Sequence, residues 1–138
     1  MSTDTTNTPT ETVAEAPALA EAVRLADGFL AGTNELDAAC RRELIESTWT
    51  ADGHFIDPLH EAADHDGLDT LFAQVHATFP GYVFTRTSDV ERVDRWFRFG
   101  WELRGEDGTL LAAGTDTCEI ADGALARVVS FYDHLATA

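Results

Sequence analysis

The sequence contains no lysine. Its nine basic residues are all arginines, and 25 aspartates and glutamates outnumber them, giving a formal net charge of −16. A surface that binds nucleic acid needs basic side chains along the phosphate backbone. The composition therefore disfavours a nucleic-acid partner, and the same negative field repels anionic substrates and anionic membrane surfaces.

Long apolar segments are also absent. No run of about 18 apolar residues occurs, and Met1 is followed by polar and acidic residues rather than by a basic start and an apolar stretch. The two cysteines, Cys40 and Cys118, lie far apart and form neither a disulfide framework nor a zinc spacing. We therefore expect a soluble, cytoplasmic protein with no membrane partner.

Three sequence motifs of enzymes are missing: Gly-x-Ser-x-Gly, the phosphate-binding loop and the dinucleotide fingerprint. Their absence disfavours nucleophilic and cofactor-dependent mechanisms, and we expect no cofactor. What remains for an enzyme is proton transfer by carboxylate or histidine side chains in an apolar setting.

Length and composition fit one globular domain, because 138 residues of which 44% are hydrophobic can bury a core that folds alone. Residues 1–16 are mostly polar or acidic and cannot offset the entropy of ordering, so we predict a disordered tail there. The domain then covers residues 17–138.

Apolar residues recur at spacings of three and four in three segments, which predicts three amphipathic helices over residues 18–32, 34–49 and 66–79. Asn34 is expected to cap the second helix, and Pro80 follows the third as a stop signal. Between the second and third helices, residues 54–57 are short enough to form one strand.

After the third helix the apolar period changes to two, which predicts strands over residues 82–93, 95–104, 109–120 and 125–134. Short turns separate these strands, so they should form an antiparallel meander. Three helices cannot cover both faces of such a sheet. The uncovered face, which carries Trp96, predicts a homodimer through the sheet.

Asp116 is a lone carboxylate on one face of the strand over residues 109–120. The rest of that face consists of Leu110, Ala112, Gly114, Cys118 and Ile120. Burial in such a surface would raise the pKa of the carboxyl group, and the small neighbours leave room for a ligand. Alternatively, Asp116 pairs with an arginine such as Arg98 or Arg127 in a structural network.

Asp57 ends the short strand directly before Pro58. In one interpretation it is a carboxylate at the mouth of a cavity, where an apolar wall from Phe55 or Ile56 tunes it as a proton carrier. In the other it opens an ordinary Asp-Pro turn. The sequence leaves both open.

The segment over residues 52–67 holds three of the five histidines. His60 and His65 are five residues apart rather than four, so they do not form a zinc-binding helix, although a loop site that also uses His54 stays open. We expect solvated histidines here and no metal. His76, on the third predicted helix, could turn its ring toward a cavity shared with Asp57.

The order of these elements, together with several short motifs, resembles the SnoaL-like group of the nuclear transport factor 2-like superfamily over about residues 18–134. The motifs are Trp49-x-x-Asp52-Gly53-x-Phe55-x-Asp57-Pro58, Phe79-Pro80-Gly81, Phe97-x-Phe99-x-Trp101, Gly114-x-Asp116 and Asp122-Gly123…Val128-Val129-x-Phe131-Tyr132-Asp133.

The resemblance implies a cone-shaped α+β fold, in which three N-terminal helices pack on a strongly curved, mainly antiparallel sheet around one apolar pocket, commonly in a dimer. In ketosteroid isomerases of this superfamily a general-base aspartate before a proline is similar to Asp57, and a protonated aspartate on a late strand is similar to Asp116. SnoaL-like cyclases also place an acid-base aspartate on a late strand, and Asp116 is similar to it.

This sequence departs from two of those relatives. The isomerases add a tyrosine from the first helix, and residues 19–31 contain none. The epoxide hydrolases of the superfamily use an Asp-Arg-Asp group, for which the candidates here are Arg98 and Arg127.

Taken together, these observations predict a small-molecule enzyme that uses carboxylate proton transfer on an apolar, carbonyl-bearing substrate, as an isomerase, cyclase or hydratase does. Asp116 and Asp57 would carry the proton, and His76 or His54 would orient the substrate. The substrate-binding wall is expected to consist of Phe55, Phe72, Phe97, Phe99, Trp101 and Phe131. The alternative is a non-catalytic module of the same fold that binds a hydrophobic ligand or serves as a dimeric scaffold.

Overall fold

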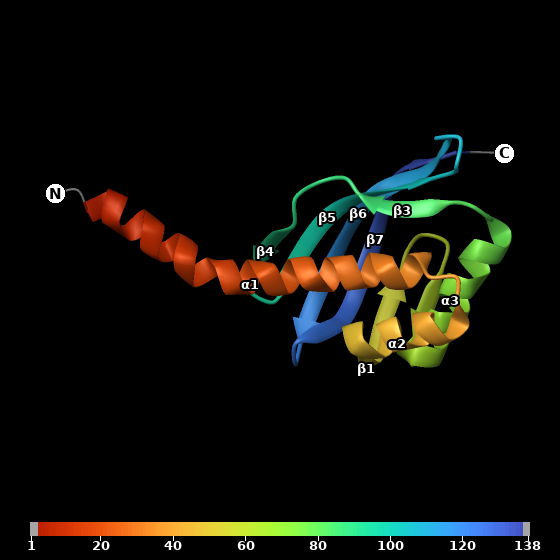
Figure 1. The fold of residues 1–138 in the computed structure, drawn as a ribbon, viewed down its shortest axis with the longest axis horizontal. Coiled ribbons are helices and arrows are strands. Elements are labelled where there is room, and N and C mark those ends of the chain that lie inside the picture. Colours follow the sequence, from red (N-terminus) through yellow and green to blue (C-terminus); the bar gives the residue numbers. More distant parts are fainter. Residues whose placement is uncertain (1–2, 137–138) are drawn as a thin grey trace.

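The computed structural model describes residues 3–136, and side chains from residue 17 onward. In this part of the chain, three helices pack on one face of a single curved sheet (Figure 1), which confirms the predicted α+β fold class. The helices are α1 (Thr3–Asn34), α2 (Ala38–Thr48) and α3 (Asp64–Thr78). The strands are β1 (Trp49–Ile56), β2 (Glu61–Ala63), β3 (Val83–Arg86), β4 (Glu91–Val93), β5 (Trp96–Arg104), β6 (Leu110–Ala121) and β7 (Ala124–Leu135).

Helix α1 begins at Thr3 rather than near Ala18, and its first turns extend away from the sheet (Figure 1). Further along, α1 buries Ala22, Ala26 and Phe29 against the sheet at spacings of four and three, as the sequence predicts. That residues 1–16 form a disordered tail stays a prediction. Residues 1 and 2 lie outside the described part.

The second and third helices begin at residues other than those predicted. Asp37, not Asn34, caps α2, because its carboxylate accepts the backbone N–H of Cys40 at 2.9 Å. Asn34 instead ends α1, and its side-chain amide exchanges two hydrogen bonds of 2.8 Å with the backbone of Phe84 on β3. Helix α3 starts at Asp64 rather than at residue 66.

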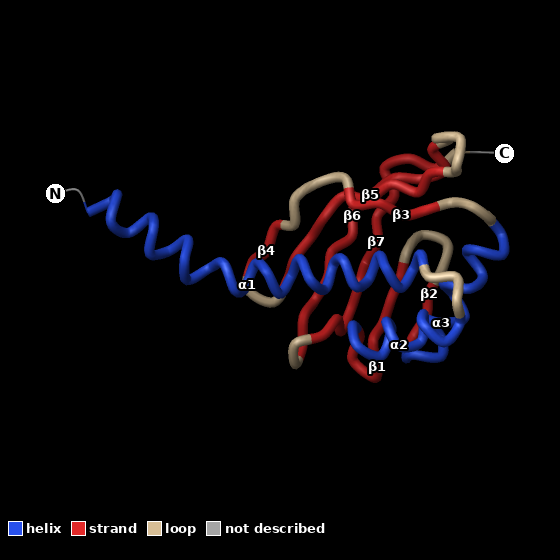
Figure 2. Tube along the Cα trace, viewed as in Figure 1, coloured by secondary structure: helices blue, strands red, loops and turns tan. Residues whose placement is uncertain are grey.

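The seven strands described form one sheet in the order β2-β1-β7-β6-β5-β3, with β4 also paired to β5 (Figure 2). Strand β1 runs parallel to β7, and the other pairs are antiparallel, so β5, β6 and β7 form the predicted meander. Two predicted boundaries were wrong. The strand predicted over residues 54–57 is β1, which already begins at Trp49, and the segment over residues 82–93 divides into β3 and β4.

That segment divides because the chain between β3 and β4 turns away from the ladder. There the Ser88 hydroxyl accepts the backbone N–H of Gly100 at 2.7 Å, in place of a strand partner. The two short strands therefore pair separately with β5.

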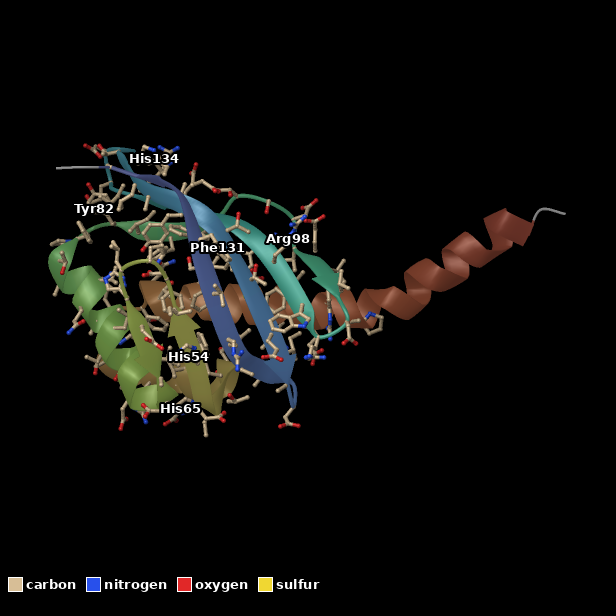
Figure 3. All side chains as sticks on the ribbon, turned by 180° about the vertical axis from the view of Figure 1, so that it is seen from behind. His54, His65, Tyr82, Arg98, Phe131 and His134 are labelled. Atoms are coloured by element: carbon tan, nitrogen blue, oxygen red, sulfur yellow. The ribbon has the colours of Figure 1, made fainter. Side chains whose placement is uncertain are left out.

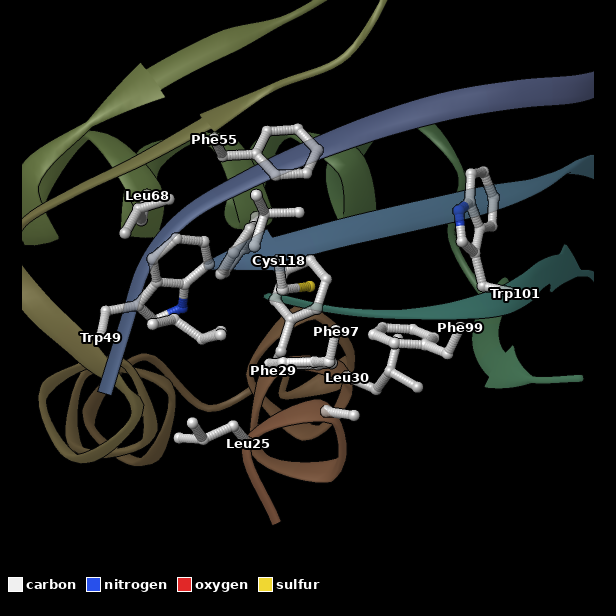
Figure 4. Packing of buried hydrophobic residues seen from close by; sticks show 14 of the residues in the cluster. Leu25, Phe29, Leu30, Trp49, Phe55, Leu68, Phe97, Phe99, Trp101 and Cys118 are labelled. Carbon is white, nitrogen blue, oxygen red and sulfur yellow. The ribbon is translucent and has the colours of Figure 1, made fainter. Parts of the chain in front are cut away.

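We call the helix-covered side of the sheet the inner face. On β5 it carries Phe97, Phe99, Trp101 and Leu103, all buried, which confirms the predicted apolar face of this strand. The ring of Phe29 lies at the centre of the core, with its centroid 5.6 to 6.4 Å from those of Trp49, Phe55, Phe72 and Phe99 (Figure 4). Helices α1 and α3 thus attach to the sheet through one aromatic cluster.

Within the described residues, no helix has both the length and the apolar character needed to cross a membrane.

Candidate active site

A cavity of about 120 Å³ lies between the inner face, α1 and α3. Its wall is mostly apolar and includes Phe29, Leu30, Phe55, Leu71, Phe72, Phe84 and Trp101. The polar side chains that reach it are those of Thr33, Asp57, His60, Asp116, Ser130 and Tyr132. Asp57 and Asp116, which are far apart in the sequence, therefore line the same cavity.

Asp116 lies in the middle of β6, opposite Phe99 on one neighbouring strand and Ser130 on the other. Alternation along the strand turns its side chain inward, and only 3% of the residue is exposed. Among the residues described, none forms a hydrogen bond to its Oδ1 atom. Asp116 is thus a buried carboxyl group with an unsatisfied oxygen.

Burial raises the pKa of Asp116 to about 7, because the ionised carboxylate loses its hydration. The Ser130 hydroxyl and the Trp101 indole lie close enough to oppose this rise, although neither completes a hydrogen bond of normal geometry to Oδ1. The negative charge of Asp57 adds a further rise. Both forms of Asp116 are therefore populated near neutral pH.

The alternative in which Asp116 pairs with an arginine is wrong. Arg98 pairs with Glu91 at 2.9 Å, and Arg127 lies 3.9 Å from Glu119. Both arginines alternate with the inward-facing residues of their strands, so their side chains lie on the outer face.

Asp57 follows the last residue of β1, and both of its oxygens are engaged. Oδ1 accepts the backbone N–H groups of Leu59 and His60 at 2.8 and 2.7 Å, which is the geometry of an Asp-Pro turn. Oδ2 accepts the hydroxyl of Tyr132 at 2.8 Å, and the His60 ring nitrogen Nδ1 lies 3.1 Å from Oδ1. Asp57 thus forms the turn and also lines the cavity, whereas its role as a proton carrier stays a prediction.

Tyr132 and Ser130 on β7 belong to this site, although the sequence analysis selected neither. Burial, reinforced by the hydrogen bond to Asp57, raises the pKa of Tyr132, so its phenol stays neutral at pH 7. The signal for both residues was the two-residue period of their strand, which places them on one face with the fully buried Val128. His60, interpreted as a solvated histidine, was missed as a cavity residue as well.

Three of the six residues predicted for the substrate-binding wall line the cavity: Phe55, Phe72 and Trp101. Phe97 and Phe99 also point inward, but they pack in the core, where their rings stack 6.3 Å apart. Phe131 is 57% exposed on the outer face (Figure 3), because it alternates with Ser130 and Tyr132 along β7.

The two histidines predicted to orient substrate do not line the cavity. His54 lies beside Glu61, with 2.7 Å between Nε2 and a carboxylate oxygen, in the pair of β1 and β2. His76 directs its ring nitrogen to the backbone carbonyl of Thr33 at the end of α1. Each ring is held by a local partner, so neither reaches Asp57 or Asp116.

In the segment over residues 52–67, each histidine ring contacts a single partner residue. His60 lies beside Asp57, and the ring of His65 lies 3.2 Å from the carbonyl oxygen of Trp49. Across the part of the chain that the structure describes, no three His, Cys, Asp or Glu side chains converge in a way that could hold a metal ion.

Several proteins of known structure are similar to this chain. No family model and no curated protein matches the sequence. A SnoaL-like family protein from Agrobacterium tumefaciens, whose name proposes isomerase activity, is 29% identical, covers 83% of this chain and 99% of its own, and has a TM-score of 0.79.

Two further structures share the fold at lower identity. One is from Sinorhizobium meliloti, with a name that proposes a polyketide cyclase, at 12% identity over 78% of this chain and 93% of its own, with a TM-score of 0.62. The other is from Kribbella flavida, with a name that proposes a ketosteroid isomerase, at 16% identity over 83% of this chain and 79% of its own, with a TM-score of 0.62. The matches confirm the resemblance stated from the sequence: the chain has the fold of the SnoaL-like group of the nuclear transport factor 2-like superfamily.

Proposed function

We propose that the protein is a cofactor-independent enzyme that moves a proton on a small, apolar, carbonyl-bearing molecule, with Asp116 as the proton carrier. The observation that supports this most directly is a carboxyl group on a mostly apolar cavity with one oxygen unpartnered and a pKa raised by burial to about 7. A carrier with such a pKa can both accept and return a proton at neutral pH.

The proposed reaction starts with the ionised form of Asp116. Its carboxylate removes a proton from the carbon next to the carbonyl group, and the electron pair of that C–H bond moves to the carbonyl oxygen as an enolate. The protonated carboxyl group then returns the proton to another carbon of the conjugated system. Atoms and charge balance without a cofactor, and the product is an isomer of the substrate.

Asp57 has a different part in this proposal. Its oxygens already accept two backbone N–H groups and a phenol, and an ionised carboxylate offers about four lone-pair positions. It therefore fixes Tyr132 at the cavity wall, and its charge helps to raise the pKa of Asp116. Asp57 supports proton transfer without carrying the proton.

The size of the cavity limits the substrate. Sites for drug-sized ligands measure roughly 300–1,000 Å³, whereas this cavity measures about 120 Å³. A molecule of one ring or a short branched chain fits that space.

The test follows isomerisation of the non-conjugated β,γ-cyclohexenone to the conjugated α,β-isomer, which is detected by its ultraviolet absorption. Asp116→Asn keeps the shape of the side chain and removes its titration, so the rate should fall by about 10²- to 10⁴-fold. Asp133→Asn, which changes an exposed aspartate on β7, is the matched control and should keep the wild-type rate. Equal rates for wild type and Asp116→Asn would contradict the proposal.

The alternative function, a non-catalytic module that binds a hydrophobic ligand, draws on the mostly apolar wall of the same cavity. It predicts that wild type and Asp116→Asn bind cyclohexanone equally and that neither accelerates isomerisation. Binding titrations beside the rate measurement therefore separate the two functions.

We also propose that the protein is a homodimer through the outer face of the sheet. That face exposes Val93 by 77% and Phe131 by 57%, and the helices lie on the opposite side (Figure 3). Light scattering should give twice the mass of one chain, and Phe131→Glu should lower it to one. A wild-type mass of one chain at micromolar concentration would contradict the dimer.

A further inference from the structure

Two buried polar atoms at the cavity lack a hydrogen-bond partner among the described residues. One is the Oδ1 atom of Asp116, and the other is the indole nitrogen Nε1 of Trp101, whose residue is 4% exposed. Buried donors are almost always paired in folded proteins, because an unpaired one has lost its bond to water without a replacement. An N–H group left unpaired on a cavity wall is therefore suited to a ligand atom that accepts a hydrogen bond.

The sheet places the two groups side by side. Asp116 pairs with Phe99 across β5 and β6, and Trp101 pairs with Gly114, so Asp116 and Trp101 are diagonal neighbours on the inner face. Diagonal neighbours lie roughly 7–8 Å apart, which long side chains can bridge. The indole lowers the pKa of Asp116 in the way that a nearby hydrogen-bond donor does, so its N–H group lies on the Asp116 side of the cavity, although no hydrogen bond of normal geometry joins the two.

The orientation of the Trp101 ring is fixed by its neighbours. Its centroid lies 5.6 Å from that of Tyr132 and 5.7 Å from that of Phe84, and in Figure 4 it stands at the opposite end of the buried cluster from Trp49. Gly114 leaves the space that the indole occupies, because a Cβ atom there would lie 3.0 Å from Trp101 Cζ2 and would overlap the carbonyl oxygen of Phe131. The N–H bond thus has a defined direction before any ligand enters.

We propose that Trp101 is a catalytic residue whose indole N–H donates a hydrogen bond to the carbonyl oxygen of the substrate. The inference rests on the proposed function, because it assigns the group that stabilises the enolate when Asp116 removes the proton. A carbonyl oxygen and the neighbouring C–H carbon are two bonds apart, so the donor and the proton carrier must be neighbours. Trp101 and Asp116 meet this requirement.

The indole suits the role chemically. It is a donor only, and it neither accepts the transferred proton nor competes with Asp116 for it. A fixed donor in an apolar cavity stabilises the enolate oxygen more than the neutral carbonyl oxygen, and this difference lowers the barrier. The substrate class follows: a small apolar molecule whose accepting oxygen lies next to an acidic C–H bond.

The binding test compares cyclohexanone with methylenecyclohexane, which has nearly the same shape and no accepting oxygen. The three tryptophans give three indole N–H signals in an NMR spectrum of the isotope-labelled protein, and Trp101→Phe identifies one of them by its loss. Cyclohexanone should move the Trp101 signal downfield, and methylenecyclohexane should not. A Trp101 signal that cyclohexanone leaves unmoved, whether or not the ketone binds elsewhere, would overturn the proposal.

Affinity and rate give a second readout. Trp101→Phe keeps an aromatic ring between Phe84 and Tyr132, and it should lower the preference for cyclohexanone over methylenecyclohexane by about 3- to 10-fold. It should lower kcat for β,γ-cyclohexenone by about 10²- to 10³-fold, with a smaller change in KM. Trp96→Phe, on the outer face, is the matched control and should change neither value. An unchanged preference and kcat in folded Trp101→Phe would contradict the role.

The outcomes distinguish this inference from the proposed function. If cyclohexanone moves the Trp101 signal but Asp116→Asn retains the wild-type rate, proton transfer by Asp116 is wrong, and the contact of Trp101 with the ketone stands as a binding contact alone. If Asp116→Asn is inactive while the Trp101 signal never moves, the proposed function stands and the role of Trp101 is wrong.

Discussion

The turn after β1 and the middle of β6 each bring one aspartate to the same cavity, under opposite conditions. In the turn, backbone N–H groups and the Tyr132 phenol donate to Asp57, so the carboxylate holds the local structure together. On β6, the neighbouring backbone groups are used by the ladder, and Oδ1 of Asp116 has no partner among the described residues. A turn offers free N–H groups to a side chain, whereas the interior of a sheet offers none. The difference separates a carboxylate that stabilises the fold from one that is available for chemistry.

The largest expected effect is on catalysis. Asp116→Asn should lower isomerisation of β,γ-cyclohexenone by at least 100-fold, whereas Asp57→Asn should stay within about tenfold of wild type, because the turnover depends on the proton carrier. Steady-state rates of the two variants at neutral pH measure this contrast. If Asp57→Asn were the more damaging change, the roles assigned to the two aspartates would have to be exchanged.

The next effect is the dependence of stability on pH. The pKa of Asp116 is about 7 in the folded protein and 3.8 without burial, so between these values the folded state binds more protons than the unfolded state. The contribution of Asp116 is complete below about pH 4 and is lost as the pH rises through about 7, a change of about 4 kcal/mol in the free energy of unfolding. Urea titrations of wild type should show this loss relative to Asp116→Asn. Parallel pH curves for the two proteins would contradict it.

Removing the carboxylate of Asp57 should destabilise the folded protein. Asp57→Ala leaves the Tyr132 hydroxyl and the turn N–H groups without an acceptor and should lower the free energy of unfolding by about 2–4 kcal/mol. Tyr132→Phe removes a single hydrogen bond and should cost about 1 kcal/mol. Chemical denaturation at neutral pH measures both. An Asp57→Ala protein as stable as wild type would show that the turn does not depend on its carboxylate.

The smallest effect concerns Ser130, whose hydroxyl lowers the pKa of Asp116 against the effect of burial. Ser130→Ala should therefore move the pKa of Asp116 upward, and the pH midpoint of activity should move with it, while Ser88→Ala outside the cavity leaves the midpoint in place. The pH-rate profile is the measurement. A downward shift would mean that the hydroxyl stabilises the protonated form instead.

Much of the fold and part of the site could be predicted because the period of apolar residues and the residues that end helices or form turns are local features of the sequence. The two-residue period predicted that Asp116 shares a face with Cys118 and that Phe97, Phe99 and Trp101 point inward. The resemblance supplied the order of helices and strands.

The site residues that the sequence analysis missed or misplaced depend on contacts between distant segments. Tyr132 reaches Asp57 because β7 pairs in parallel with β1, with Ile56 opposite Val129, and no local pattern specifies that register. His76 and His54 were assigned to the cavity from their residue type, whereas a helix-end carbonyl and a neighbouring glutamate decide where their rings lie.

The parallel pairing of β1 with β7 also has a kinetic consequence. Contacts between segments far apart in the chain form slowly, because a long loop must close before the contact can stabilise it. Helices and the β5–β6–β7 meander depend on nearer neighbours and can form earlier. The cavity is complete only when β1 joins β7, so recovery of activity in a refolding experiment should lag behind recovery of helical circular dichroism.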